Sequence, residues 1–325
     1  MSRATSSAGL KALAVITTVG LFIVNIVGFI DTETGSTFGC GNDWPLCNGD
    51  LIPHKWGIHT LIEFGHRAIV GIVTVLLVFL VVWVLMKYRQ EMKARLLVWI
   101  SAGFVVVQAA LGAMAVFFVN PPWVIAFHFG FSLLAFSGVF LLTVSIWKYS
   151  NPTKSEHLLD LEGVQDRAEK SMRSWVLFLF VYLYCAIYLG AFVSSQGVGA
   201  SFRGWPFPTE TAGGLTLFLD YAHRTVAFGL FVFVLTVVVK AYRLKGQRPD
   251  LYKGSVYLLT FTVLQIFSGA FVVYTHYSLS SPLQLSGFLI HVSIMTFLFT
   301  SLAYMGLQLL PRQARARAKQ QAMSY

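Results

Sequence analysis

Eight long apolar runs constrain this chain more than any other feature of its sequence. A helix needs about 20 residues to cross the hydrocarbon core of a bilayer, where every backbone polar group must be paired within the protein. Only 12% of the residues are charged and the mean hydropathy is +0.68, whereas a soluble domain carries about 25% charged residues. The sequence therefore predicts an all-α integral membrane protein of the lipid bilayer, with helices at 10–30, 66–86, 96–119, 123–147, 174–194, 221–240, 254–275 and 284–309.

The first apolar run is long enough to span a membrane, and no small-residue cleavage site of a signal peptide follows it. We therefore expect residues 10–30 to be retained as a helix rather than removed.

The distribution of basic residues predicts how the helices are oriented. If the N-terminus is cytoplasmic, 20 of the 24 Lys and Arg residues fall in cytoplasmic connections or tails. The four on the other side are Lys55, Arg67, Arg203 and Arg224. Because cytoplasmic loops carry the excess of basic residues, we expect both termini to be cytoplasmic and the protein to lie in the cell (plasma) membrane. The net charge of +10 then reflects topology, and a nucleic-acid partner is not expected.

The second half of the chain repeats the first. The matching pairs are Trp44-Pro45 with Trp205-Pro206, Glu63-x-x-His66-Arg67 with Asp220-x-x-His223-Arg224, Gln108-x-x-x-Gly112 with Gln265-x-x-x-Gly269, and His128 with His291. Each half has an even number of spans, so both halves enter the membrane in the same direction. We predict two four-helix bundles with a pseudo-two-fold relation, formed by residues 1–150 and 173–325, with a cytoplasmic linker at 151–172 and a basic C-terminal tail.

Four of the histidines recur at matching depth. His66 and His128 lie near the outer ends of the second and fourth runs, and His223 and His291 occupy the same places in the second half. A single interfacial histidine can be a simple polar anchor, but intramembrane ionisable residues are usually functional. Neutral imidazole is a common axial ligand of haem iron, so the pattern predicts two haem sites, with metal ligands His66 and His128, and His223 and His291. A zinc site is less favoured because no third ligand repeats.

The two halves differ at a carboxylate. Glu63 of the first half corresponds to the shorter Asp220 of the second. On a helix, Glu63 shares a face with His66 and Arg67. Glu63 can therefore form an i,i+4 ion pair with Arg67, or it can act as a proton acceptor beside a bound haem. Arg67 and its counterpart Arg224 are also candidates for binding haem propionates.

A pair of cysteines marks the outer loop of the first half. Cys40 and Cys47 correspond to Ser201 and Pro208 in the second half, and they lie on the oxidising face of the membrane. They can form a structural clip or a redox-exchanging pair. Cys185, within the fifth run, is expected to be a small buried apolar residue.

These features together resemble the haem A synthases, in the form found in Gram-positive bacteria. The resemblance is carried by Glu-Phe-Gly-His-Arg at 63–67, by Cys-Gly-Asn-Asp-Trp-Pro-Leu-Cys at 40–47 and by the three other histidines. It covers nearly the whole chain. It implies oxidation of the C8 methyl group of haem O to a formyl group, by successive hydroxylations that give haem A.

The resemblance also implies roles for individual residues. It assigns a haem b cofactor to His223 and His291, the substrate haem to the region of His66 and His128, a catalytic role to Glu63 and a disulfide to Cys40 and Cys47. Haem O synthase and an electron acceptor such as a quinone are the partners it suggests.

Two other classes of protein remain open from the residues themselves. A di-haem membrane cytochrome would transfer electrons without modifying haem, and a haem carrier or chaperone would bind haem through exchangeable ligands. The cytochrome predicts equivalent halves, and the unequal outer loops count against it.

Overall fold

The computed structural model describes residues 8–150, 164–195, 202–278 and 281–310. Much of the predicted linker and nearly all of the basic tail lie outside these residues. The described chain forms eight helices, each long and apolar enough to cross a membrane. They are α1 (Ala8–Glu33), α2 (Ile58–Lys87), α3 (Met92–Phe117), α4 (Pro122–Ser150), α5 (Val164–Ser195), α6 (Gly214–Arg243), α7 (Pro249–Ser278) and α8 (Ser281–Gln308). The prediction of an all-α, multi-pass membrane protein is confirmed.

Most helices extend beyond the apolar runs that predicted them. The second helix begins at Ile58 rather than at 66, and the sixth begins at Gly214 rather than at 221. Polar residues outside the hydrocarbon core can continue a helix because hydropathy does not limit helix formation in water. As a result, Glu63 and Asp220 lie within helices and share them with the histidines three residues later.

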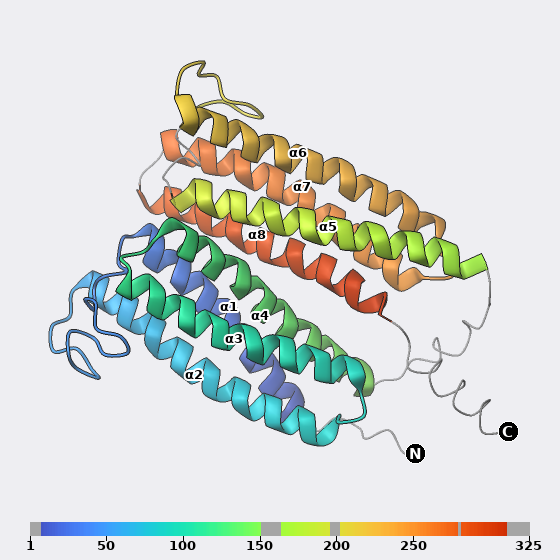
Figure 1. The fold of residues 1–325 in the computed structure, drawn as a ribbon, viewed down its shortest axis with the longest axis horizontal. Helices are drawn as coiled ribbons and strands as arrows, with labels where there is room; N and C mark the ends of the chain where they lie inside the picture. Colours follow the sequence, from blue (N-terminus) through green and yellow to red (C-terminus); the bar gives the residue numbers. More distant parts are fainter. Residues whose placement is uncertain (1–7, 151–163, 196–201, 279–280, 311–325) are drawn as a thin grey trace.

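The helices pack in two groups of four (Figure 1). In the lower group, α1 packs against α2 and α4, and α3 packs against α4; in the upper group, α6 packs against α5 and α7, and α7 against α8. Each group has its own apolar core. The pseudo-two-fold relation between the groups and the cytoplasmic location of the termini remain predictions.

Helix α4 joins the two groups. In its most apolar stretch 72% of the residues are buried, against 22–33% in the other seven helices of the described chain, because α4 contacts α1 and α3 on one side and α5 and α8 on the other. Ser137 of α4 hydrogen-bonds Thr300 of α8 at 2.8 Å. The ring of Phe136 packs against Phe297 with centroids 6.4 Å apart. The two groups therefore share a packed interface.

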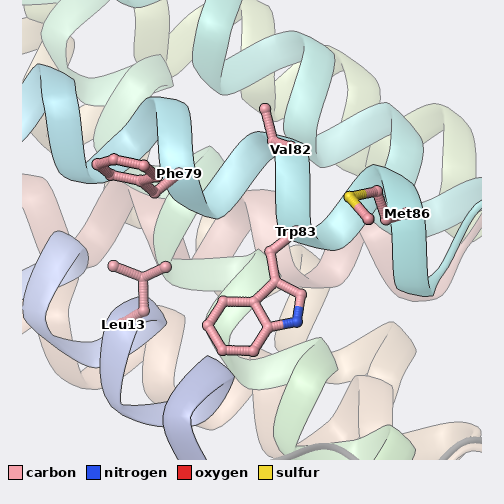
Figure 2. Close-up of a pocket in the computed structure, with 5 residues that line it drawn as sticks. All are labelled: Leu13, Phe79, Val82, Trp83 and Met86. Atoms are coloured by element: carbon pink, nitrogen blue, oxygen red, sulfur yellow. The ribbon is translucent and has the colours of Figure 1, made fainter.

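The lipid-facing surface is apolar, as a bilayer requires. A groove of about 490 Å³ lies between α1 and α2. The indole of Trp83 projects into it (Figure 2). An added Cβ at Gly9 would lie only 3.2 Å from this ring, so the glycine leaves room for the indole. Besides Trp83, the groove is lined by Leu13, Phe79, Val82 and Met86.

The expectation for Cys185 is wrong. Its thiol is exposed on α5 rather than buried. Hydropathy cannot distinguish a core position from a lipid-facing one, because both environments are apolar.

A buried arginine connects three helices of the second group. It lies at the end of the molecule opposite the loop that contains Cys40 and Cys47. Arg248, in the turn between α6 and α7, is only 2% exposed. Its guanidinium pairs with Glu169 of α5 and with Asp250 of α7, and it donates to the backbone carbonyl of Gln308 in α8 at 2.9 Å. One side chain therefore fixes the ends of α5, α7 and α8 relative to one another.

We predict that Arg248→Ala lowers the free energy of unfolding by about 2–3 kcal/mol. Removing one partner of a fully buried ion pair costs about 3–5 kcal/mol, but here water reaches the carboxylates, whose side chains are 27% and 26% exposed. Thermal unfolding in detergent measures the loss. The control is Arg243→Ala, at an exposed position in the last turn of α6, for which we expect about 0.5 kcal/mol or less. Equal effects of the two substitutions would contradict the role given to Arg248.

Candidate haem-binding site

The four predicted histidines lie near the same ends of four helices. His66, His128, His223 and His291 are six to ten residues past the first residues of α2, α4, α6 and α8. At 1.5 Å per residue this is about 9 to 15 Å along each axis. His66 lies near His128, and His223 lies near His291. The structure therefore brings the histidines together in the two predicted pairs.

Each imidazole faces a glycine on the helix before its own. An added Cβ at Gly28 of α1 would lie 2.9 Å from Cε1 of His66, and one at Gly190 of α5 would lie 2.9 Å from Cε1 of His223. The corresponding distances are 3.6 Å from Gly112 to His128 and 3.5 Å from Gly269 to His291. Sequence reasoning found Gly112 and Gly269 but missed Gly28 and Gly190. A glycine at the same place in all four odd-numbered helices could have revealed them.

The second histidine pair borders a large cavity. Its volume is about 1030 Å³, at the upper end of the range of about 300–1,000 Å³ that is usual for ligand sites. The lining includes His223 and His291, with Asp220 and Arg224 at the end of the cavity near the outer loop. Phe29 of α1 and other residues of the first group close one side. The cavity has the size and the largely apolar walls that suit a haem, and two imidazoles line it.

The Glu63 carboxylate is held by one side chain and by one backbone amide. Its side chain is only 3% exposed. One carboxylate oxygen pairs with the guanidinium of Arg67, and the other accepts a hydrogen bond of 2.6 Å from the backbone N–H of Cys40. Arg67 also donates to the carbonyl of Asp43 at 3.0 Å. The carboxylate is thus fixed at the junction of α2 with the outer loop.

The disulfide is part of this junction. Cys40 and Cys47 are bonded and fully buried, as the resemblance implied. Gly39 lies so close to the first turn of α2 that an added Cβ would overlap the backbone of His59. Its carbonyl accepts a hydrogen bond of 2.9 Å from the hydroxyl of Thr60. These contacts hold the N–H of Cys40 against Glu63.

The second half repeats the ion pair between the carboxylate and the arginine. Asp220 pairs with Arg224 at 2.8 Å, and Arg224 donates to the carbonyls of Gly204 and Phe202 at 2.6 and 3.2 Å. Arg224 also donates a hydrogen bond from Nε to Oδ1 of Asp220 at 3.2 Å. The ion pair is therefore common to both halves, while the contact with a disulfide loop distinguishes Glu63.

The two glutamines contact the histidines differently. The Gln108 amide donates to the backbone carbonyl of His128 at 2.7 Å, whereas the Gln265 amide lies 2.9 Å from Nε2 of the His291 ring. Both glutamines thus contact a histidine of their own helix group. Within the described residues, no three His, Cys, Asp or Glu side chains cluster as a metal site would require.

Comparison with known proteins identifies the family. Residues 55–303 match the family described as "Cytochrome oxidase assembly protein". A "Heme A synthase" of Staphylococcus epidermidis is 33% identical over 301 residues, which cover 91% of this chain and 94% of that protein. The enzyme of the same name from Staphylococcus saprophyticus is 32% identical over 303 residues, covering 92% and 95%. That from Staphylococcus aureus is 31% identical over 299 residues, covering 91% and 93%.

The chain belongs to the haem A synthase family. The resemblance found in the sequence is therefore confirmed, and it extends over nearly the whole chain.

One buried carboxylate of this family member was missed. Asp31 directly follows the helix predicted at 10–30, but it lies in the last turn of α1, is 7% exposed and lies near Glu63 and Arg67. Because Gly28 corresponds to Gly190, Val193 of α5 stands at the position of Asp31. The first site thus has a second acidic residue beside Glu63, whereas Glu33 of α1 lines the cavity of the second site. The sequence did not show that α1 continues beyond its apolar run as far as Glu33.

We predict that Gly39→Ala lowers the free energy of unfolding by about 3 kcal/mol, the upper end of the usual cost of overpacking, because the added methyl group meets backbone rather than a movable side chain. It should also expose the amide of Cys40 to solvent. Thermal unfolding and hydrogen exchange of the outer loop measure the two effects. The control is Gly57→Ala, whose added Cβ would have its nearest contact, Thr60 Oγ1, at 3.9 Å. Rapid exchange at Cys40 in both variants would contradict the role assigned to Gly39.

Proposed function

We propose that this protein is a haem A synthase that oxidises the C8 methyl group of haem O to a formyl group. Family membership and the curated names of its relatives support an enzyme of haem A biosynthesis. The observation that carries the finer proposal is the asymmetry around Glu63. Two histidine pairs lie at corresponding positions, but in the described residues only the first pair has a buried glutamate held by a disulfide loop.

The second pair is suited to hold a resident haem b. His223 and His291 face a cavity of about 1030 Å³, and Nδ1 of His223 is buried without a hydrogen-bond partner in the described part of the chain. The ring of His223 is therefore held by packing against Gly190 rather than by a hydrogen bond to Nδ1. When bound between these residues, haem b would supply one-electron transfer toward an acceptor such as a quinone.

The first pair is the proposed site for the substrate. His66 and His128 would bind the iron of haem O and so orient its methyl group relative to Glu63, three residues before His66. Arg67 and Arg224 already donate to loop carbonyls, so any contact with haem propionates would share or replace these bonds. The outer loops would then respond to occupancy of the sites.

The proposed reaction is a stepwise oxidation in which water supplies the oxygen. The methyl group loses two electrons and two protons as water adds to give the alcohol. A second oxidation and a second water give the geminal diol, which loses one water to form the aldehyde. In total four electrons and four protons leave, and the acceptor class that takes the electrons is a quinone or its equivalent.

Glu63 is the proposed proton acceptor. Its carboxylate is anionic when paired with Arg67 and the N–H of Cys40, and a base placed beside the reacting carbon typically contributes about 10²–10⁴-fold to a rate. Haem O synthase, which makes the substrate, is the proposed partner for delivery.

The identity of the bound haem tests the function. Purified protein should release haem b together with haem A or a hydroxylated haem O, identified by mass. The His223→Ala variant should lose haem b, because the iron loses one axial ligand. Two haem b molecules per chain, with no oxidised haem O from cells that make it, would instead establish the di-haem cytochrome.

A substitution at Glu63 tests the chemistry. We predict that Glu63→Gln lowers conversion of haem O by at least about 10²-fold while both haems remain bound, because the amide keeps the shape but accepts no proton. The control Asp220→Asn changes the matching position of the other half and should cause a much smaller loss of conversion. A Glu63→Gln enzyme that binds both haems and converts haem O at the normal rate would remove Glu63 from the mechanism.

A further inference from the structure

The hydroxyl of Ser268 distinguishes His291 from the other three histidines. Ser268, on α7, is 5% exposed, and its Oγ lies 2.9 Å from Nδ1 of His291. The Nδ1 atoms of His66, His128 and His223 are buried and have no hydrogen-bond partner within the described residues. Of the four imidazoles, His291 alone therefore has its inner nitrogen hydrogen-bonded in this part of the chain.

The contacts of Ser268 determine which nitrogen of His291 carries the proton. A serine hydroxyl has a single proton to donate, and Ser268 donates it to the backbone carbonyl of Gln265 at 2.9 Å. Its oxygen must then accept from His291, which requires a proton on Nδ1. The lone pair of the ring is therefore on Nε2, the nitrogen through which His291 would bind iron.

Gln265 lies against the same ring. Its amide nitrogen is 2.9 Å from Nε2 of His291 and 3.2 Å from Nδ1, so it is close to both ring nitrogens and does not select between the two tautomers. The tautomer therefore follows from Ser268, and an iron bound at Nε2 would take the place of the Gln265 amide there.

The first half lacks this arrangement. The segment Gln108-Ala-Ala-Leu111-Gly112 aligns with Gln265-Ile-Phe-Ser268-Gly269, so a buried leucine stands where the second half has the serine. Gln108 donates to the backbone of His128 rather than to its ring. The ring of His128 is therefore oriented by packing without a hydrogen bond to Nδ1.

We propose that Ser268 is a positioning residue that makes His291 a strong, permanent iron ligand and so retains haem in the second site. When a histidine binds a metal through one ring nitrogen, a hydrogen bond from the other fixes the ring and raises its basicity, and loss of such a bond typically costs about 10–100-fold in metal affinity. Leu111 gives His128 no such support, which suits a site that must release its haem as product. The inference rests on the proposed ligation of haem b by His291.

The test compares haem retention in Ser268→Ala, Ser268→Thr and the parent protein. Transfer of haem b to excess apomyoglobin, followed by absorbance, reports affinity, and a spectroelectrochemical titration reports the midpoint potential of the haem that remains. We expect Ser268→Ala to bind haem b about 10–100-fold more weakly and to show a more positive potential, because a less basic imidazole stabilises ferric iron less. Ser268→Thr keeps the hydroxyl and should restore both values.

The matched control is Ser293→Ala. Ser293 lies on α8 two residues after His291, and its hydroxyl bonds the carbonyl of Leu289 in its own helix, so its removal should leave affinity and potential unchanged. Parental values in Ser268→Ala would overturn the proposal. So would a loss that threonine does not restore or that Ser293→Ala reproduces, since either result would reflect packing alone.

The outcome is separable from that of the proposed function. If His291→Ala abolishes haem b binding while Ser268→Ala leaves affinity and potential unchanged, the ligand assignment holds and the inference about Ser268 fails. If His291→Ala retains haem b in full, the ligand assignment itself fails.

Discussion

The end of this protein that carries the disulfide loop depends on pairing a carboxylate with an arginine inside a membrane helix. An ionised carboxylate at such a depth is costly unless a positive group and hydrogen bonds compensate it. Glu63 and Asp220 are paired with Arg67 and Arg224 one helical turn later. Each arginine also donates to carbonyls of the adjacent outer loop. The same contact that makes the carboxylate tolerable therefore holds a loop over the end of each helix group, close to the histidines.

The two sites share this frame and differ in what is added to it. The first site adds the disulfide loop, whose Cys40 N–H reaches Glu63, and a second buried carboxylate at Asp31. The second site adds a hydrogen bond between the Ser268 hydroxyl and the imidazole of His291. In the proposed enzyme these additions divide the work. Glu63 and Asp31 would accept protons beside the substrate haem, and Ser268 would support a histidine ligand of the resident haem. The contact of the disulfide loop with Glu63 also gives the cysteines a structural role that is independent of redox exchange.

Much of this arrangement could be predicted from the sequence, because hydropathy and an internal repeat are both visible in one dimension. The eight helices, the pairing of the histidines and the ion pairs of Glu63 and Asp220 follow from spacing alone. The contact of Cys40 with Glu63 does not, since it joins a loop amide to a side chain 23 residues later. Nor does the exposure of Cys185, because lipid and protein core are equally apolar. Asp31 was missed because α1 continues past the end of its apolar run.

The aligned pair Leu111 and Ser268 shows why a repeat is most informative where it fails. Both residues lie one position before the glycine that faces a histidine, so the surrounding geometry is held nearly constant and the side chain alone differs. The Ser268 hydroxyl donates its one proton to the carbonyl of Gln265 and so accepts from the ring of His291, whereas the isobutyl group of Leu111 offers no hydrogen bond. A membrane interior amplifies this difference, because no water is available to replace the missing partner. In the proposed enzyme, a single buried hydroxyl is thus sufficient to separate a haem that stays from a haem that leaves.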